Sequence, residues 1–311
     1  MGNLYHMESA LQSIRLKEMK IDSLIVAASG DERAYNSISE MLRKGFQIEN
    51  LVVFKFESQC VEPDDPMYDA YSQYSSFPLP TTEMYFKDDL IALNPGDFEG
   101  KNVVVDITGF SVPNLFRMLF VMKEVLNIRR LHMLYTEPQH YIFGDDTFGS
   151  YSYFIGEREY RSLDEFYISG DDGRELLTIF LGFDRMTSSI VKEAVDPIET
   201  VLVNGFPSMS PKLKDVSLLN NKELISVLGR PAFSVKTNNP FSAYNALQKI
   251  QKDHPDTLIN VCVLGTKAMA LGAGVYALQN RNVKVSYAYT KKHSASISRG
   301  VSNMWYYCID L

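Results

Sequence analysis

The stretch INVCVLGTKAMALG, residues 259–272, passes from an apolar run through Gly-Thr-Lys into small and apolar residues. The apolar run predicts a buried strand over 258–267, and the small residues predict a helix over 268–280. A glycine lets the backbone approach a ligand closely, while Thr, Lys and the first N–H groups of a helix can donate to an anion. The alternative is an ordinary strand-to-helix turn with Lys267 in water, and this stretch taken alone favours the alternative.

The rest of the second half continues the alternation of strands and helices. Its apolar runs predict strands over 176–184, 198–208, 258–267 and 282–293. Helical spacing of apolar residues predicts helices over 185–195, 241–251 and 268–280.

The first half shows the same alternation. Its predicted strands are 22–30, 48–58, 101–110 and 129–138, the last ended by Pro138, and its predicted helices are 31–45 and 112–126. Residues 59–95 are rich in Pro, Asp, Ser and Tyr and form an excursion without a clear period. Strands that alternate with helices favour a parallel sheet covered on both faces.

The two halves can be laid over each other at a nearly constant offset. IENLVV at 48–53 corresponds to IETVLV at 198–203, and three further pairs of positions agree within a few residues: Asp31 with Asp184, Gly109 with Gly265, and Tyr135 with Tyr287. Any two units of one α/β type share order and spacing, but the common string favours a true duplication. The predicted fold class is therefore α/β, with two Rossmann-like parallel-sheet domains related by internal duplication. We expect a leader over 1–20, disordered or vector-derived, a first domain over 21–170 and a second over 171–311.

Composition limits the classes of function. The formal net charge of −7 argues against an extended nucleic-acid surface, although a local basic pocket for a small anion stays open. The three cysteines, Cys60, Cys262 and Cys308, are widely spaced, form no metal-ligand pair and indicate a reducing, cytoplasmic compartment. No apolar run reaches membrane-spanning length. We expect neither a metal nor a cofactor.

Ligands of open parallel α/β sheets bind beyond the carboxyl ends of the strands. In the first half these ends carry mainly acidic and small residues, and in the second half mainly cationic ones. The candidate ligand-binding residues are Ser29, Gly30, Asp31, Thr108, Gly109, Glu137, Gly265, Thr266, Lys267, Met269, Lys291 and His293. A cationic wall suits phosphates, and an acidic wall suits ribose hydroxyls or base amino groups. If the halves face each other, one shared pocket results.

The stretch NVCVLGTKAMALGAGVYAL, followed by VKVSYAY, resembles the Gly-Thr-Lys-x-Met signature of CARF domains. These are Rossmann-like sensors of cyclic oligonucleotides in prokaryotic antiviral systems. Gly265, Thr266, Lys267 and Met269 match the signature, whereas Asn260 stands one residue too far upstream and Leu264 replaces the first glycine. The duplication is similar to the SAVED domain, two CARF-like units in one chain. The resemblance implies a nucleotide ligand held between the halves.

The sequence carries no effector motif, so the resemblance implies a partner effector protein, and a homo-oligomer is possible. Three functions stay open: a nucleotide sensor or regulatory subunit, a nucleotide-processing enzyme such as a ring nuclease or other phosphodiesterase, and a scaffold with a vestigial pocket. In the enzyme, Lys267 and His293 would stabilise charge on the phosphate. His132, within a predicted strand, is expected to be a satisfied core or edge histidine, and 304–310 a final buried strand.

Overall fold

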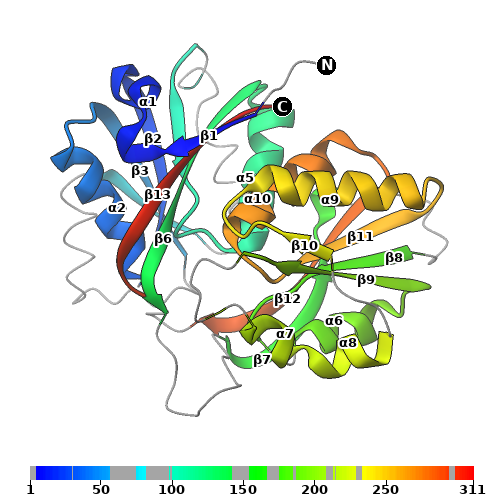
Figure 1. Cartoon of the computed structure of the whole chain (residues 1–311). Coiled ribbons are helices and arrows are strands. Elements are labelled where there is room, and N and C mark those ends of the chain that lie inside the picture. The colour runs from blue at the N-terminus through cyan, green and yellow to red at the C-terminus, as the bar shows by residue number, and fades with distance from the viewer. Residues whose placement is uncertain are drawn as a thin grey trace. The chain divides into compact units, whose positions relative to one another are not determined.

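The computed structural model describes most of the chain, and its contacts divide the chain into two units. The described residues are 5–29, 31–56, 75–81, 98, 100–141, 154–166, 175–184, 187–207, 213, 215–228, 233–293 and 298–311. Unit 1 comprises Met1–Ile142 together with Lys292–Leu311, and unit 2 comprises Phe143–Lys291. Each unit is built on its own sheet (Figure 1).

Unit 1 is a mixed sheet with helices on both faces. Its elements are β1 (Tyr5–Ser9), η1 (Ala10–Gln12), α1 (Ile14–Glu18), β2 (Ile21–Ala28), α2 (Glu32–Arg43), β3 (Ile48–Phe56), β4 (Ser75–Thr81), β5 (Val103–Asp106), α5 (Val112–Phe120), the π-helix η4 (Val121–Val125), β6 (Arg130–Tyr141) and β13 (Ser298–Asp310). The described residues form seven strands in the order β1-β13-β6-β5-β2-β3-β4. The strands from β4 to β6 are parallel, and β13 and β1 extend the sheet antiparallel.

Unit 2 repeats the parallel part of this arrangement. Its elements are β7 (Phe154–Ser162), η5 (Asp164–Phe166), β8 (Glu175–Phe180), α6 (Thr187–Val195), β9 (Glu199–Gly205), α7 (Val216–Asn220), α8 (Lys222–Leu228), β10 (Phe233–Val235), α9 (Pro240–Asp253), β11 (Leu258–Val263), α10 (Lys267–Gln279) and β12 (Val283–His293). The described strands follow the order β10-β9-β8-β11-β12-β7. Figure 1 shows α9 and α10 on one face of this sheet and α6, α7 and α8 on the other.

The strand orders of the two units agree, as the predicted duplication requires. In chain order, the five parallel strands of each unit lie as third, second, first, fourth and fifth across the sheet. The strings noted in the sequence occupy equivalent places, because Val53 pairs with Val26 of β2 and Val203 pairs with Phe180 of β8. The α/β class with two Rossmann-like units is therefore confirmed.

The apolar patterning of the strands explains the two cores. Leu24 and Val26 of β2 pack with Ile38 and Met41 of α2 on one face of unit 1. In unit 2, Leu177 and Ile179 of β8 pack with Val191 of α6 and Leu224 of α8. Parallel strands buried on both faces need such near-continuous apolar runs.

The division of the chain differs from the expected domains. The expected leader is ordered from Tyr5 onward, because β1 pairs with β13 and Leu16 of α1 is fully buried in the core of unit 1. The first unit ends at Ile142 rather than at 170, and the final strand, predicted from 304–310, lies in unit 1 rather than in the second domain. The sequence pattern predicted that strand, but not which sheet it joins.

One strand boundary differs from expectation, and one strand was not expected at all. Pro138 does not end β6, which runs on to Tyr141. Proline is tolerated there because β5 ends at Asp106, opposite Leu134, and because the pairing of β6 with β13 is irregular between Val301 and Met304. β4 was missed because its sequence, SSFPLPT, contains two prolines.

Candidate functional site

The Gly-Thr-Lys loop lies at the carboxyl end of β11 and leads directly into α10. Helix α10 begins at Lys267, which the sequence had placed in the strand. Thr266 is the N-cap residue: its Oγ1 accepts from the Met269 N–H at 3.3 Å and donates to the Thr237 carbonyl at 2.5 Å. A threonine at this position satisfies a backbone donor that the helix cannot, so the first task of Thr266 is to start α10.

Two glycines bring the loops after β8 and β11 into backbone contact. A Cβ on Gly182 would lie 2.1 Å from the Leu264 carbonyl oxygen, and one on Gly265 would lie 3.2 Å from the Leu181 carbonyl oxygen. Leu264 also donates its N–H to the Phe180 carbonyl at 2.9 Å. β8 and β11 are the neighbours at which the strand order reverses. In doubly wound sheets, ligands bind at this point.

Lys267 occupies the first turn of α10, where a positive charge is electrostatically unfavourable. The N-terminal end of a helix carries a partial positive charge and favours acidic residues or anions. The first turn of α10 contains no acidic residue, and Lys267 is half-buried. An anion at this end would interact favourably with both the lysine and the helix.

Met269, the last residue of the signature, points into the core. Its side chain is 1% exposed. Its Cε lies 2.6 Å from the place that a Cβ on Gly205 would take. Met269 thus packs beneath the ends of β9 and β11, and a direct ligand contact by this residue stays a prediction.

Three polar residues that the sequence analysis did not select hold the loop after β8. Ser217 Oγ and Asn221 Nδ2 donate to the Gly182 carbonyl at 3.1 and 3.2 Å, and Asn220 Nδ2 donates to the Phe183 carbonyl at 2.5 Å. All three side chains are buried. The only signal for them is the pair of adjacent asparagines in a polar stretch, which by itself predicts a turn.

In unit 1, Asp31 is part of a buried ion pair. Its Oδ2 lies 2.9 Å from Arg33 Nε, and its Oδ1 accepts from Ser298 Oγ. Arg33 Nη1 reaches the Tyr135 hydroxyl at 3.4 Å and the Thr136 carbonyl at 3.3 Å. Burial alone would lower the pKa of Arg33, but Asp31 and the two neighbouring tyrosines raise it above its ordinary value. The guanidinium is therefore charged and paired inside the unit.

Thr108 and Glu137 are also engaged within unit 1. Thr108 Oγ1 accepts from the Thr136 N–H at 2.9 Å, and Glu137 Oε2 accepts from Asn303 Nδ2 at 2.9 Å. Both residues are buried. Asp106 Oδ1 accepts from the Thr108 N–H at 2.9 Å, and burial raises the pKa of Asp106 despite this bond. The predicted acidic wall thus ties β5, β6 and β13 together.

Of the remaining candidate residues, some are placed by the structure and others lie outside the described residues. Gly109 allows the loop after β5 to approach β2, since a Cβ there would lie 2.1 Å from the Ala27 carbonyl oxygen. Ser29 Oγ accepts from the Asp31 N–H at 3.2 Å. Gly30 and the side chains of Lys291 and His293 lie outside the described residues. The ligand-binding roles of all the candidates stay predictions.

The described residues limit which metal sites and reactive thiols this part of the protein can contain. Among them, no group of three or more His, Cys, Asp or Glu side chains could hold a metal ion. Burial raises the pKa of Cys262, which favours the unreactive thiol. In the same part of the chain, no helix is long and apolar enough to cross a membrane.

Comparison with known proteins shows likeness only at the level of the fold. No protein-family model and no curated protein matches the chain. A SAVED/CARF-domain receptor of Acinetobacter baumannii, solved with a cyclic trinucleotide, is similar with a TM-score of 0.37 and 10% identity over 90% of this chain and 50% of that one. A universal stress protein of Pseudomonas aeruginosa gives 0.26 and 9%, over 86% and 92%. The chain spans about half the length of the A. baumannii receptor. A similarity this low supports no conclusion about the function of this chain or about its binding residues.

Proposed function

We propose that the protein is a nucleotide-binding sensor or regulatory subunit whose ligand lies at the carboxyl ends of the parallel strands. The ligand class is a small anionic nucleotide, with a cyclic oligonucleotide as the member that the Gly-Thr-Lys-x-Met resemblance suggests. In this proposal, binding is passed on to a partner effector protein of a prokaryotic antiviral system.

The observation that carries the proposal is the loop from Leu264 to Lys267. It stands where the strand order reverses, glycines bring backbone against backbone, and a lysine occupies the first turn of a helix that has no acidic residue there. Each feature has a separate structural explanation, but an anion at the end of α10 accounts for them together.

The share of unit 1 in the ligand site is a further part of the proposal. Asp31, Thr108 and Glu137 are hydrogen-bonded within their own unit. Their side-chain oxygens are already engaged, so we expect these residues to position the backbone and the neighbouring loops around a ligand rather than to bind it directly. A ligand held between the halves, with Gly265, Thr266, Lys267 and His293 on one side, stays the predicted arrangement.

The first experiment analyses what the purified protein carries. The protein is denatured, and released small molecules are identified by mass spectrometry. A sensor releases an intact nucleotide, whereas the alternative, a ring nuclease or other phosphodiesterase, releases a cleaved one. If neither is released, and cyclic oligonucleotides added to the protein fail to bind, the proposal is wrong.

The second experiment tests Lys267 directly. We expect Lys267→Ala to weaken nucleotide binding by about 1.5–3 kcal/mol, the usual range for a hydrogen bond to a charged group. Folding stability should change little, because the helix dipole opposes a cation in the first turn. Lys252→Ala, which removes an exposed lysine of α9, is the matched control and should leave binding unchanged. A Lys267→Ala variant that unfolds easily yet binds normally would assign the lysine a structural role.

A further inference from the structure

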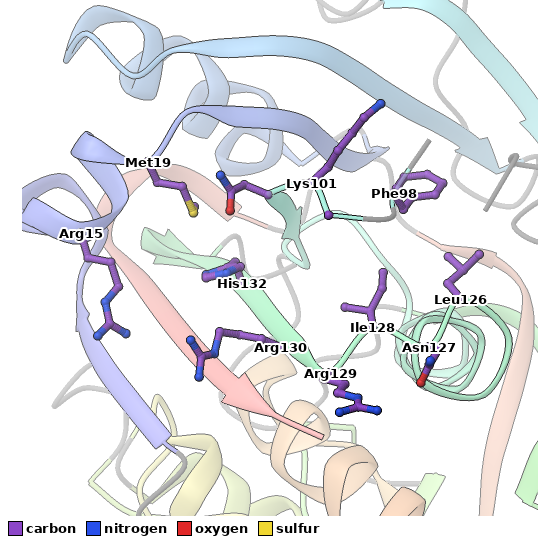
Figure 2. Close-up of a pocket in the computed structure, with 12 residues that line it drawn as sticks. Arg15, Met19, Phe98, Lys101, Leu126, Asn127, Ile128, Arg129, Arg130 and His132 are labelled. Atoms are coloured by element: carbon purple, nitrogen blue, oxygen red, sulfur yellow. The ribbon is translucent and has the colours of Figure 1, made fainter. Parts of the chain in front are cut away.

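A hollow with a basic lining opens at the amino ends of the strands of unit 1, on the side of the sheet away from their carboxyl ends (Figure 2). Its volume is about 810 Å³, within the range of small-molecule sites. The lining residues come from α1 and from the segments that lead into β2, β5 and β6, three neighbouring parallel strands. β5 spans four residues, so this edge lies roughly 13 Å from the carboxyl ends of the same strands.

Three arginines supply most of the charge of the hollow. Arg15 comes from α1, Arg129 from the segment before β6, and Arg130 from the start of β6. Arg130 Nε lies 2.6 Å from Asp310 Oδ1, whereas the side chains of Arg15 and Arg129, both exposed, make no hydrogen bond or ion pair with another described residue. No Asp or Glu is among the residues that line the hollow in the described part. The hollow therefore carries a net positive charge.

Two of the three arginines, Arg130 and Arg15, act electrostatically on one lining side chain, His132. Its Nδ1 lies 2.7 Å from the Tyr306 hydroxyl, and the two rings are stacked with centroids 5.9 Å apart. Burial, with help from Arg130 and Arg15, lowers the pKa of His132 to about 4. Both arginines therefore contribute positive charge to the part of the hollow that His132 lines.

Part of the lining forms an apolar wall. Met19, Leu126 and Ile128 are half-buried, and Phe98 is 5% exposed. The segment that carries Leu126 and Ile128 follows the π-helix η4 and contains Asn127 in a left-handed conformation, with φ at 50°. π-Helical turns are uncommon and are frequent at functional sites. The wall offers contact to a nonpolar group rather than to water alone.

We propose that this hollow is a second ligand site, which binds a phosphomonoester with an apolar or aromatic body. The guanidinium groups match phosphate oxygens in geometry as well as in charge. The apolar wall contacts the body of the ligand. This site is separate from the carboxyl-edge nucleotide site and does not depend on it.

The experiment measures binding of 1-naphthyl phosphate to the full chain by calorimetry. We expect one saturable site, with inorganic phosphate and 1-naphthol each binding at least about tenfold more weakly, since each lacks one of the two kinds of contact. Arg15→Gln and Arg129→Gln should each weaken binding by about tenfold. Both residues are exposed, so neither substitution should disturb folding.

Two matched controls separate this site from nonspecific charge and from the nucleotide site. Lys17→Gln removes an exposed positive charge from the same helix as Arg15, outside the hollow, and should leave binding unchanged. Lys267→Ala should also leave it unchanged. The inference is overturned if no saturable binding is seen, if Lys17→Gln weakens binding as much as Arg15→Gln, or if only Lys267→Ala weakens it. Naphthyl phosphate binding that follows Arg15 and Arg129, in a protein that neither releases a nucleotide on denaturation nor binds a cyclic oligonucleotide, would refute the proposed function and support this site.

Discussion

Arg33 is a charged side chain that unit 1 buries almost completely, with 3% of its surface exposed. Its partner Asp31 is equally buried, at 3%. Replacing Asp31 by Ala leaves an uncompensated guanidinium in the interior, which typically costs about 3–5 kcal/mol. We therefore expect Asp31→Ala to lower the free energy of unfolding by that amount, measured by urea denaturation.

The same helix provides the control. Glu40 and Arg43 form an ion pair at 2.6 Å near the end of α2, with Arg43 largely in water. Glu40→Ala should change stability far less than Asp31→Ala, because exposed ion pairs contribute little. Equal effects of the two substitutions would contradict the structural role of Asp31. Loss of ligand binding in Asp31→Ala is informative only after its folding has been checked.

His132 makes the stability of the protein depend on pH. Its pKa is lowered to about 4 in the folded state, from 6.5 for a free imidazole. The folded state therefore binds fewer protons than the unfolded state between these values, so the stability from neutral His132 is present above pH 6.5 and is lost as pH falls toward 4. We expect the free energy of unfolding of the wild type to fall more steeply over this range than that of His132→Gln. Parallel pH profiles would show that His132 is not held neutral.

The residue types of the site could be predicted from the sequence more readily than their tasks. Gly-Thr-Lys at the end of an apolar run predicted a change from strand to helix, and β11 does lead into α10 there, although the strand ends at Val263 rather than at 267. The pairing of Asp31 with Arg33, or of Glu137 with Asn303, could not be predicted, because such pairs depend on which strands become neighbours. His132 was expected to be a satisfied histidine, and its bond to Tyr306 confirms this.

At the scale of elements, α10 packs against α9 through a glycine. A Cβ on Gly272 would lie 1.9 Å from the Pro240 carbonyl oxygen, which is backbone and cannot rotate away. On an exposed helix, Gly→Ala stabilises by about 1 kcal/mol. Here overpacking should dominate, so we expect Gly272→Ala to destabilise unit 2 by about 1–3 kcal/mol or more, measured by urea denaturation. A variant as stable as the wild type would mean that the two helices separate at little cost.

The elements with a strong period were predicted well, and the irregular ones were not. β2, α2, β3 and β11 agree with the predicted segments within a few residues, because burial on both faces makes their strands continuously apolar. β4 and the second half of β6 contain proline, which in a local pattern argues against a strand. Only the neighbouring strand shows whether the missing N–H matters.

At the scale of the whole molecule, β13 belongs to unit 1 although it follows unit 2 in the chain. Ten of its residues pair with β6 and five pair with β1, and Tyr306 and Tyr307 are fully buried. In native-state hydrogen exchange, the amides of β13 should therefore open with the same free energy as those of β6. If the amides of β13 instead exchange together with those of β8 and β11, the assignment of β13 to unit 1 is wrong.

The duplication was visible in the sequence because it repeats a local string. The return of the last strand to the sheet of unit 1 was not visible. A short apolar run predicts a strand, but nothing in the sequence of residues 304–310 indicates that this strand pairs with β6. The predicted boundary at 170 followed a polar, Gly-containing segment, whereas the division at 142 follows the end of β6. Long-range pairing decides such boundaries, and local composition does not record it.

The late return of β13 has a consequence for synthesis on the ribosome. The chain emerges from its N-terminus at about 5–20 residues per second. After β6 has been made, the 156 residues from 142 to 297 must follow before β13 begins, which takes roughly 8–30 s. Through that interval β6 presents an unpaired edge to other nascent chains. Unit 2 therefore completes its sheet before unit 1, and the half of the protein that is made first is the half that is finished last.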